Sequence, residues 1–210
     1  LARGETDISS GLGEEELLLQ QVAFGWGGED VSISIADMAA KGMEATYSMG
    51  DDSPLAVLST YPHVPYNYFR QRFAQVTNPP IDPLREGEVM SLAMALGRRG
   101  HVLNEQSDDS ATKVVTVDSP VLAEQEMAKL RDPEAMKGLK TATLSTLYEK
   151  SSERGALKAT VADICAKAVE LVESGAADVL VLSDMDGVSE GTLYVPPLVA
   201  VGAVHHELIS

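Results

Sequence analysis

The last third of the chain pairs an amphipathic helix with a wholly apolar strand, and this pairing constrains the fold more than any other feature. Apolar residues recur at the spacing of one helix face over residues 157–174: Leu157, Val161, Ile164, Ala168, Leu171 and Val172. Gly175 ends the pattern, and residues 179–182 are entirely apolar, as in strands buried on both faces. A helix, a short loop and a buried strand form the repeating unit of parallel α/β proteins. We therefore predict an α/β fold with layers of parallel strands and helices, in which this helix packs on this strand with Leu171 buried.

The rest of the chain alternates between shorter predicted helices and strands. Residues 30–42 fit two structures, because Val31, Ile33 and Ile35 alternate with polar residues as in a strand, whereas Asp30 is suited to cap a helix. The other predicted helices cover residues 14–24, 65–74, 83–97, 124–130 and 196–206, and the other predicted strands cover residues 113–117 and 140–147.

Composition excludes several classes of protein. The chain has 210 residues, which fits one domain, and its formal net charge of -16 argues against nucleic acid and anionic membrane surfaces as partners. No apolar run approaches the roughly 18–20 residues that membrane insertion needs. The single cysteine, Cys165, excludes a disulfide framework and a cysteine-ligated iron–sulfur cluster within the chain. Because Cys165 lies on the apolar side of the predicted helix, we expect a small buried hydrophobe rather than a reactive thiol.

Asp184 and Asp186 are the candidate catalytic or metal-binding residues of the α/β unit. Asp184 directly follows the buried strand, where active-site residues of α/β proteins lie, and Asp186 is close enough in sequence to share a metal ion or a substrate with it. The alternative is a plain turn through Asp186 and Gly187, because no histidine, glutamate or cysteine accompanies the two aspartates at ligand spacing.

Two other polar pairs have structural alternatives. Asp51 and Asp52 suggest a metal site, but Gly50 supplies the backbone freedom of a turn that aspartates stabilise by accepting amide hydrogen bonds. His205 and His206 are adjacent, so on a helix their side chains point about 100° apart and do not bind one ion. We expect one packed and one exposed histidine.

The run over residues 49–85 is the most distinctive part of the sequence. It contains a Gly-Asp-Asp-Ser-Pro turn, an apolar segment, an aromatic-rich segment and three closely spaced prolines at Pro79, Pro80 and Pro83, which fix the backbone φ angle. This run resembles the central domain of glutamate synthase, in which a near-identical run lies between the glutaminase and flavin domains. The resemblance extends in matching order through residues 21–26, 118–122, 140–144, 177–184 and 197–206.

The resemblance implies a function without catalytic residues in this chain. Glutamate synthases make glutamate from glutamine and 2-oxoglutarate, and ammonia released by an N-terminal cysteine travels through an internal tunnel to a flavin and iron–sulfur centre. Residues 13–210 would form the partial-barrel-like connecting domain, truncated at its C-terminal end, after a flexible segment over residues 1–12. FMN and the iron–sulfur cluster would belong to other parts of the parent enzyme. The partners would be other domains or subunits of the synthase, with no nucleic acid and no membrane insertion, in the cytoplasm or the plastid stroma.

The same resemblance suggests which residues line or brace the ammonia path: Met49, Gly50, Asp51, Asp52, Thr77 and Asn78. A conduit for ammonia needs fixed hydroxyls, amides and carbonyls rather than charges, and Thr77 and Asn78 supply them beside the stiff prolines. The alternative is that Thr77 and Asn78 cap the preceding helix and shape the turn. Two other functions stay open: a stand-alone structural or interaction subunit that kept this fold without a role in glutamate synthesis, and a small α/β enzyme that uses Asp184.

Overall fold

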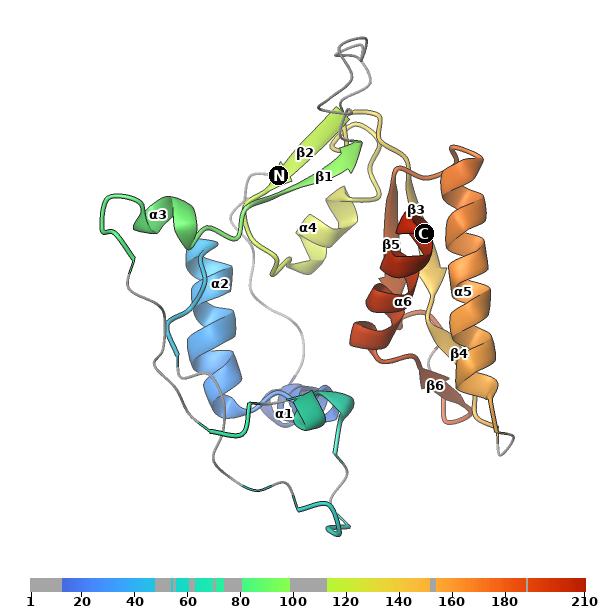
Figure 1. Cartoon of the computed structure of the whole chain (residues 1–210), viewed down its shortest axis with the longest axis horizontal. Coiled ribbons are helices and arrows are strands. Elements are labelled where there is room, and N and C mark those ends of the chain that lie inside the picture. The colour runs from blue at the N-terminus through green and yellow to red at the C-terminus, as the bar shows by residue number, and fades with distance from the viewer. Residues whose placement is uncertain are drawn as a thin grey trace. The chain divides into compact units, whose positions relative to one another are not determined.

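The computed structural model divides the chain into two compact units, whose elements are labelled in Figure 1. Unit 1 comprises Leu1–Ala95 and Thr116–Glu126, and unit 2 comprises Leu96–Val115 and Met127–Ser210. The structure describes residues 13–47, 54, 56–60, 63–69, 71–73, 81–98, 113–151, 154–187 and 189–210. The N-terminal segment over residues 1–12 lies outside the described residues.

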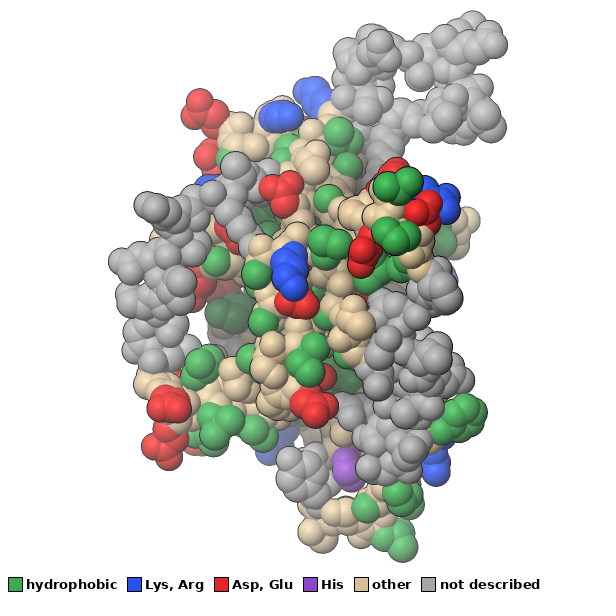
Figure 2. All heavy atoms as spheres, turned by 90° about the vertical axis from the view of Figure 1, so that its left-hand side faces the viewer, with side chains coloured by type: hydrophobic (Ala, Val, Ile, Leu, Met, Phe, Trp, Pro, Cys, Tyr) green, Lys and Arg blue, Asp and Glu red, His purple; other side chains and the backbone are tan. Residues whose placement is uncertain are grey.

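Helix α1 (Glu14–Ala23) confirms the predicted helix at the start of unit 1. Its first turn holds three glutamates, whose charge is favourable near a helix N-terminus, and the chain leaves the helix at Gly25 with a φ of 75°. No residue of α1 is buried, and Leu19 is 66% exposed. Figure 2 shows apolar side chains at the surface among acidic ones. An exposed helix with leucines on more than one face is typical of a part that packs against further protein.

Residues 30–41 are helical, which decides between the two structures that the sequence allows for this segment in favour of the helix. A π-helix, η1 (Asp30–Ile35), continues directly into α2 (Ala36–Lys41), and Gly42 ends α2 in the left-handed conformation with a φ of 62°. A methyl group on Gly42 would also collide with the backbone carbonyl oxygen of Asp118. Glycine is therefore required here both by the backbone angle and by the close approach of the chain.

The predicted helix over residues 83–97 is wrong. Only α3 (Glu86–Val89) is helical, and the N–H of Leu92 donates to the carbonyl of Gly42 over 2.8 Å. The following residues form β1 (Met94–Arg98), which pairs with β2 (Lys113–Val117). The backbone N–H and C=O groups of this segment thus bond to residues far away in the sequence instead of to one another within a helix. These long-range bonds outweigh the local apolar pattern, which favours a helix.

Three further elements predicted for this part of the chain can be compared with the structure. The predicted helix over residues 65–74 is shorter, because only η2 (Pro65–Phe69) is helical, as a 3₁₀-helix, and residues 71–73 are not. Strand β2 and helix α4 (Glu124–Lys129) are confirmed. Between them, the buried Ser119 donates its hydroxyl to the carbonyl of Met38 over 2.7 Å, which fastens the turn after β2 to helix α2.

Unit 2 contains the predicted parallel α/β unit. Strands β3 (Thr141–Ser145) and β5 (Val179–Ser183) are parallel, with Thr141 opposite Val179 and Ser145 opposite Ser183. Helix α5 (Ala156–Glu173) lies between them in the chain and supplies the crossover that a parallel pair needs. The helix and the strand expected from the last third of the sequence are both present, but β5 is not buried along its whole length: only its residues Val181 and Ser183 are buried.

The predicted strand over residues 140–147 is interrupted at Thr146. Beyond it, β4 (Leu147–Glu149) pairs antiparallel with β6 (Thr192–Tyr194). Thr146 is buried at the junction, where its N–H donates to the carbonyl of Ser183 over 2.8 Å and its own carbonyl accepts the N–H of Val195 over 2.9 Å. This one residue therefore joins the parallel pair to the antiparallel pair.

The core of unit 2 lies between its two long helices and the strands. Helix α6 (Pro197–Ile209) confirms the last predicted helix. It packs against α5 and β5, and α5 also packs against β3 and β4. Leu171 is only half-buried, because the buried stripe of α5 is centred on Ile164. The buried cluster consists of Ile164, Cys165, Ala168, Val195, Ala200 and Val204, with Leu144, Leu180 and Leu182 of the strands packed against it.

The α/β fold class is confirmed by these elements. Within the described residues the strands form three two-stranded sheets, one of them parallel, and they do not close into a barrel. None of the helices in this part of the chain is both long enough and apolar enough to cross a membrane.

Candidate functional site

The loop that contains Asp184 and Asp186 leaves the carboxyl ends of the parallel strands, where the sequence predicted it. Asp184 is half-buried, Asp186 is exposed, and Met185 between them is 74% exposed. The loop begins with a local hydrogen bond in which the N–H of Met185 donates to the hydroxyl of Ser183 over 3.3 Å. It turns at Gly187, which has a φ of 94°. This geometry is that of a surface turn fastened at its first residue.

The loop brings no third ligand to the two aspartates. Within the described part of the chain, no group of three or more histidine, cysteine, aspartate or glutamate side chains is arranged to hold a metal ion. The metal or catalytic role of Asp184 and Asp186 stays a prediction. The residues proposed for the ammonia path, Met49, Gly50, Asp51, Asp52, Thr77 and Asn78, lie outside the described residues.

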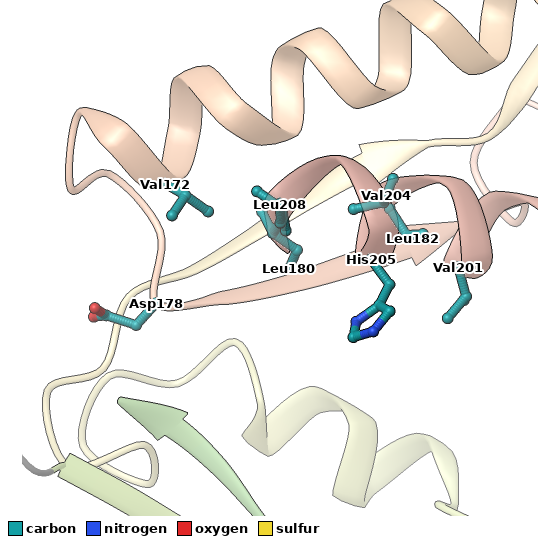
Figure 3. Close-up of a pocket in the computed structure, with 8 residues that line it drawn as sticks. All are labelled: Val172, Asp178, Leu180, Leu182, Val201, Val204, His205 and Leu208. Carbon is teal, nitrogen blue, oxygen red and sulfur yellow. The ribbon is translucent and has the colours of Figure 1, made fainter. Parts of the chain in front are cut away.

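The pocket in unit 2 lies along strand β5 and helix α6, and we call it the β5–α6 groove (Figure 3). Its volume is about 350 Å³, and most of its lining is apolar. Helix α6 contributes residues spaced for one face of a helix, and β5 contributes two residues that point to one side of the strand. The lining residues are Val172, Asp178, Leu180, Leu182, Val201, Val204, His205 and Leu208.

The sequence analysis missed this groove, although its signal is present. Leu180 and Leu182 alternate along the strand, and Val201, Val204 and Leu208 recur at helical spacing. What the pattern did not reveal is that Val201 stays 57% exposed, so that part of this apolar face is left uncovered in the structure.

Asp178, at one end of the groove, has a structural role. Its carboxylate oxygen Oδ2 accepts the N–H of Lys140 over 2.9 Å, and its own N–H donates to the carbonyl of Lys140 over 2.8 Å. The ammonium group of Lys140 donates to the carbonyl of Gly175 over 2.8 Å. These bonds fasten the turn between α5 and β5 to the start of β3, which sets the register of the parallel pair.

Replacing Asp178 by alanine is expected to lower the free energy of unfolding by about 1 kcal/mol, because the N–H of Lys140 loses its side-chain acceptor. Asp178→Asn is the matched control, since the amide oxygen still accepts this bond, and it should retain most of the stability. Urea unfolding of the two variants and the parent chain measures the difference. Equal stability of the alanine and asparagine variants would show that the bond contributes nothing.

The remaining candidate side chains do not assemble a reactive centre. The rings of His205 and His206 meet edge to face with centroids 5.4 Å apart, and both residues are exposed, so the expectation of one packed histidine is wrong. Cys165 is buried, as predicted. Its burial raises the pKa of its thiol, and the negative charge of the Glu207 carboxylate raises this pKa further. A raised pKa disfavours the thiolate, which is the nucleophilic form.

Comparison with known proteins identifies the family. The family model described as the glutamate synthase central domain matches residues 19–210. The chain belongs to the glutamate synthase central domain family. The elements described above, from the second half of helix α1 to helix α6, thus lie within the glutamate synthase central domain.

The curated relatives of this central domain are much longer proteins. It is 44% identical over 198 residues to ferredoxin-dependent glutamate synthase 2 of a Synechocystis strain, a match that covers 93% of the chain and 12% of the relative. It is 48% identical over 199 residues to the chloroplastic ferredoxin-dependent glutamate synthase 2 of Arabidopsis thaliana, again with 93% and 12% covered. The chloroplastic enzyme of Spinacia oleracea is 46% identical over 202 residues, with 95% and 12% covered. The chain therefore spans about an eighth of the length of these relatives.

Proposed function

We propose that the chain is the connecting domain of a glutamate synthase, which joins a glutaminase domain to an FMN domain. The observation that carries this proposal is the match of residues 19–210 to the family, combined with relatives of which the chain covers only 12%. The exposed leucines of helix α1 support it, because apolar side chains on a connecting domain have neighbouring domains to cover them. The domain would hold its neighbours at a fixed separation rather than react with a substrate.

The second part of the proposal is that this domain lines the ammonia path. Met49, Gly50, Asp51 and Asp52 would form one wall, and Thr77 and Asn78 another. Ammonia both donates and accepts hydrogen bonds, so hydroxyl, amide and carbonyl groups guide it without trapping it as an ion. The sequence places the hydroxyl of Thr77 and the side-chain amide of Asn78 beside Pro79 and Pro80. The restricted φ angles of the two prolines favour one fixed backbone shape.

The cofactors of the proposed enzyme would be bound by other parts of the polypeptide. An iron–sulfur cluster needs several cysteine thiolates, and the chain has only Cys165, which is buried in the core of unit 2. The FMN would likewise be held by the flavin domain. Because the relatives named above are ferredoxin-dependent and the plant enzymes are chloroplastic, we propose reduced ferredoxin as the electron donor, and the plastid stroma or the cytoplasm as the compartment.

The isolated chain is expected to have no glutaminase or glutamate synthase activity and to bind neither FMN nor an iron–sulfur cluster. The physical reason is that the chain lacks the cysteine ligands that an iron–sulfur cluster needs. Within the residues that the structure describes, it also has no group of side chains arranged to bind a metal ion. Ammonia release from glutamine and the visible absorption spectrum of the purified chain measure these properties. A flavin absorption band that co-purifies in stoichiometric amount would contradict the assignment of the cofactors to other domains.

A further inference from the structure

Two stretches of unit 1 that lie far apart in the sequence are tied together at the ends of helices α2 and α3. An isolated antiparallel bridge joins Met43 to Ser91 there, and Figure 1 shows the two helix ends beside each other. Next to the bridge, each stretch donates one backbone N–H to a carbonyl of the other, over 2.7 Å and 2.8 Å. We call these two stretches, residues 42–44 and 90–92, the clasp.

The clasp is anchored to the rest of unit 1. Gly42 approaches the carbonyl oxygen of Asp118 so closely that a side chain at Gly42 would collide with it. The neighbouring Ser119 donates its hydroxyl to the carbonyl of Met38 over 2.7 Å, and Ala45, which directly follows the first stretch of the clasp, is 2% exposed. Hydrogen bonds in a buried and cross-linked part of a fold open rarely. The clasp therefore has one fixed position within unit 1.

The clasp closes the base of the loop over residues 45–89, and both proposed walls of the ammonia path belong to this loop. The wall of residues 49–52 follows the clasp after only a few residues, and the wall of Thr77 and Asn78 precedes Asp82 by only a few residues. Because each residue extends a chain by at most about 3.6 Å, short connections leave little freedom relative to the base to which they are attached. A fixed base therefore restricts where both walls can lie.

Asp82 fastens the chain on the far side of the loop to the helix that leads into the clasp. Its carboxylate oxygen Oδ1 accepts the N–H of Leu84 over 3.0 Å, and Oδ2 accepts the Nε–H of Arg85 over 3.1 Å. Its carbonyl also accepts the N–H of Arg85 over 2.9 Å. Arg85 is the N-cap residue of α3, and its carbonyl accepts the N–H of Val89 over 2.9 Å. One aspartate thus joins the segment after Pro80 to helix α3.

We propose that the clasp and Asp82 together hold the two walls of the ammonia path at a fixed separation, which makes Asp82 a positioning residue for the transfer of ammonia. This inference rests on the proposed function and adds the residues that keep the path in shape. A displacement of about 1 Å is enough to impair a site that must match a small molecule. An aspartate that only stabilised its own turn would affect the stability of the protein and not the fate of ammonia.

The ratio of glutamine hydrolysed to glutamate formed by the complete enzyme tests the role of Asp82. Asp82→Ala removes both side-chain hydrogen bonds and should raise this ratio at least roughly twofold, because ammonia escapes from a path whose walls are no longer held. Asp82→Asn keeps an oxygen that accepts the N–H of Leu84, and it should stay close to the ratio of the parent. Glutamate formation from added ammonium salt should be unchanged in both variants.

Asp163→Ala is the matched control. It removes another exposed ion pair between neighbouring turns of chain, in which Asp163 accepts from Lys167 over 2.6 Å, but it lies on helix α5 of unit 2. The ratio should stay at that of the parent. One-to-one coupling in Asp82→Ala, or equal uncoupling in Asp163→Ala, would overturn the positioning role.

The outcomes separate a failure of this inference from a failure of the proposed function. If Thr77→Val uncouples the enzyme and Asp82→Ala does not, the ammonia path stands and the positioning role of Asp82 falls. If the parent polypeptide neither hydrolyses glutamine nor forms glutamate, the proposed function falls and this inference falls with it.

Amide hydrogen exchange of the complete protein tests the clasp without any assay of activity. The N–H groups of Glu44 and Leu92 donate across the clasp to the carbonyls of Met90 and Gly42. Both should exchange at least roughly a hundredfold more slowly than in the unfolded chain. In Asp82→Ala they should stay slow, while the N–H of Leu84 should exchange faster because it loses its acceptor. Exchange of Glu44 and Leu92 at the rate of the unfolded chain in the parent protein would overturn the proposal.

Discussion

Replacing Ile164 by alanine is expected to lower the free energy of unfolding of the chain by about 2–5 kcal/mol. Ile164 is 3% exposed and lies at the centre of the cluster that joins α5 to α6 and to the strands. The substitution removes buried methyl and methylene groups and leaves a cavity that close-packed neighbours fill only in part. Because a domain of this size is stabilised by only about 5–15 kcal/mol in total, the loss should shift the urea midpoint strongly.

The matched control is Leu157→Ala in the same helix. Leu157 is 40% exposed, and alanine favours the helix, so this variant should lose less than about 1 kcal/mol. Urea unfolding followed by circular dichroism compares the two variants directly. A similar loss for both would show that the apolar face of α5 is not ordered around Ile164 as the structure has it.

Replacing Thr77 by valine in the complete enzyme is expected to uncouple ammonia release from glutamate formation. Valine keeps the volume of threonine but removes the hydroxyl that we propose ammonia contacts. The loss of one hydrogen bond worth about 1.4 kcal/mol corresponds to roughly a tenfold change in the passage of ammonia. Parallel assays of glutamine hydrolysis and glutamate formation should therefore show hydrolysis in excess.

Thr77→Ser keeps the hydroxyl and is the control for this variant. It should retain the one-to-one coupling, whereas a purely structural role in the turn would leave the coupling of both variants unchanged. If Thr77→Val keeps one-to-one coupling at unchanged rates, Thr77 has no part in the conduit, and only the capping role in the turn is left for it.

The sequence predicted those parts of the fold in which local pattern and tertiary packing agree. Helix α5 and strand β5 were recognised because the same residues that give the helical and apolar patterns also form the core, as Ile164 and Ala168 do. The helix predicted over residues 83–97 is wrong for the opposite reason. Its apolar residues repeat at helical spacing, but the carbonyl of Gly42, distant in the sequence, binds the N–H of Leu92, and β2 pairs with the segment that follows.

The candidate site was less predictable than the fold. The position of Asp184 at the end of a parallel strand follows from the order of the elements, and it was predicted correctly. The β5–α6 groove depends on which side chains remain uncovered after packing, as Val201 does, and periodicity shows only which face is apolar. The role of Asp178 as an acceptor for Lys140 joins residues far apart in the sequence, and local patterns carry no information on such a pair.

The mass of the native polypeptide tests the central claim most directly, namely that this chain is the connecting domain of a glutamate synthase. Immunoblotting with an antibody raised against the chain, followed by peptide mapping of the detected protein, measures that mass and identifies the flanking domains. Because the chain of 22.3 kDa covers 12% of its relatives, we predict a polypeptide about eight times as heavy, with a cysteine-headed glutaminase domain on one side and a flavin domain on the other. A native polypeptide of 22.3 kDa would contradict the account and identify the chain as an independent subunit.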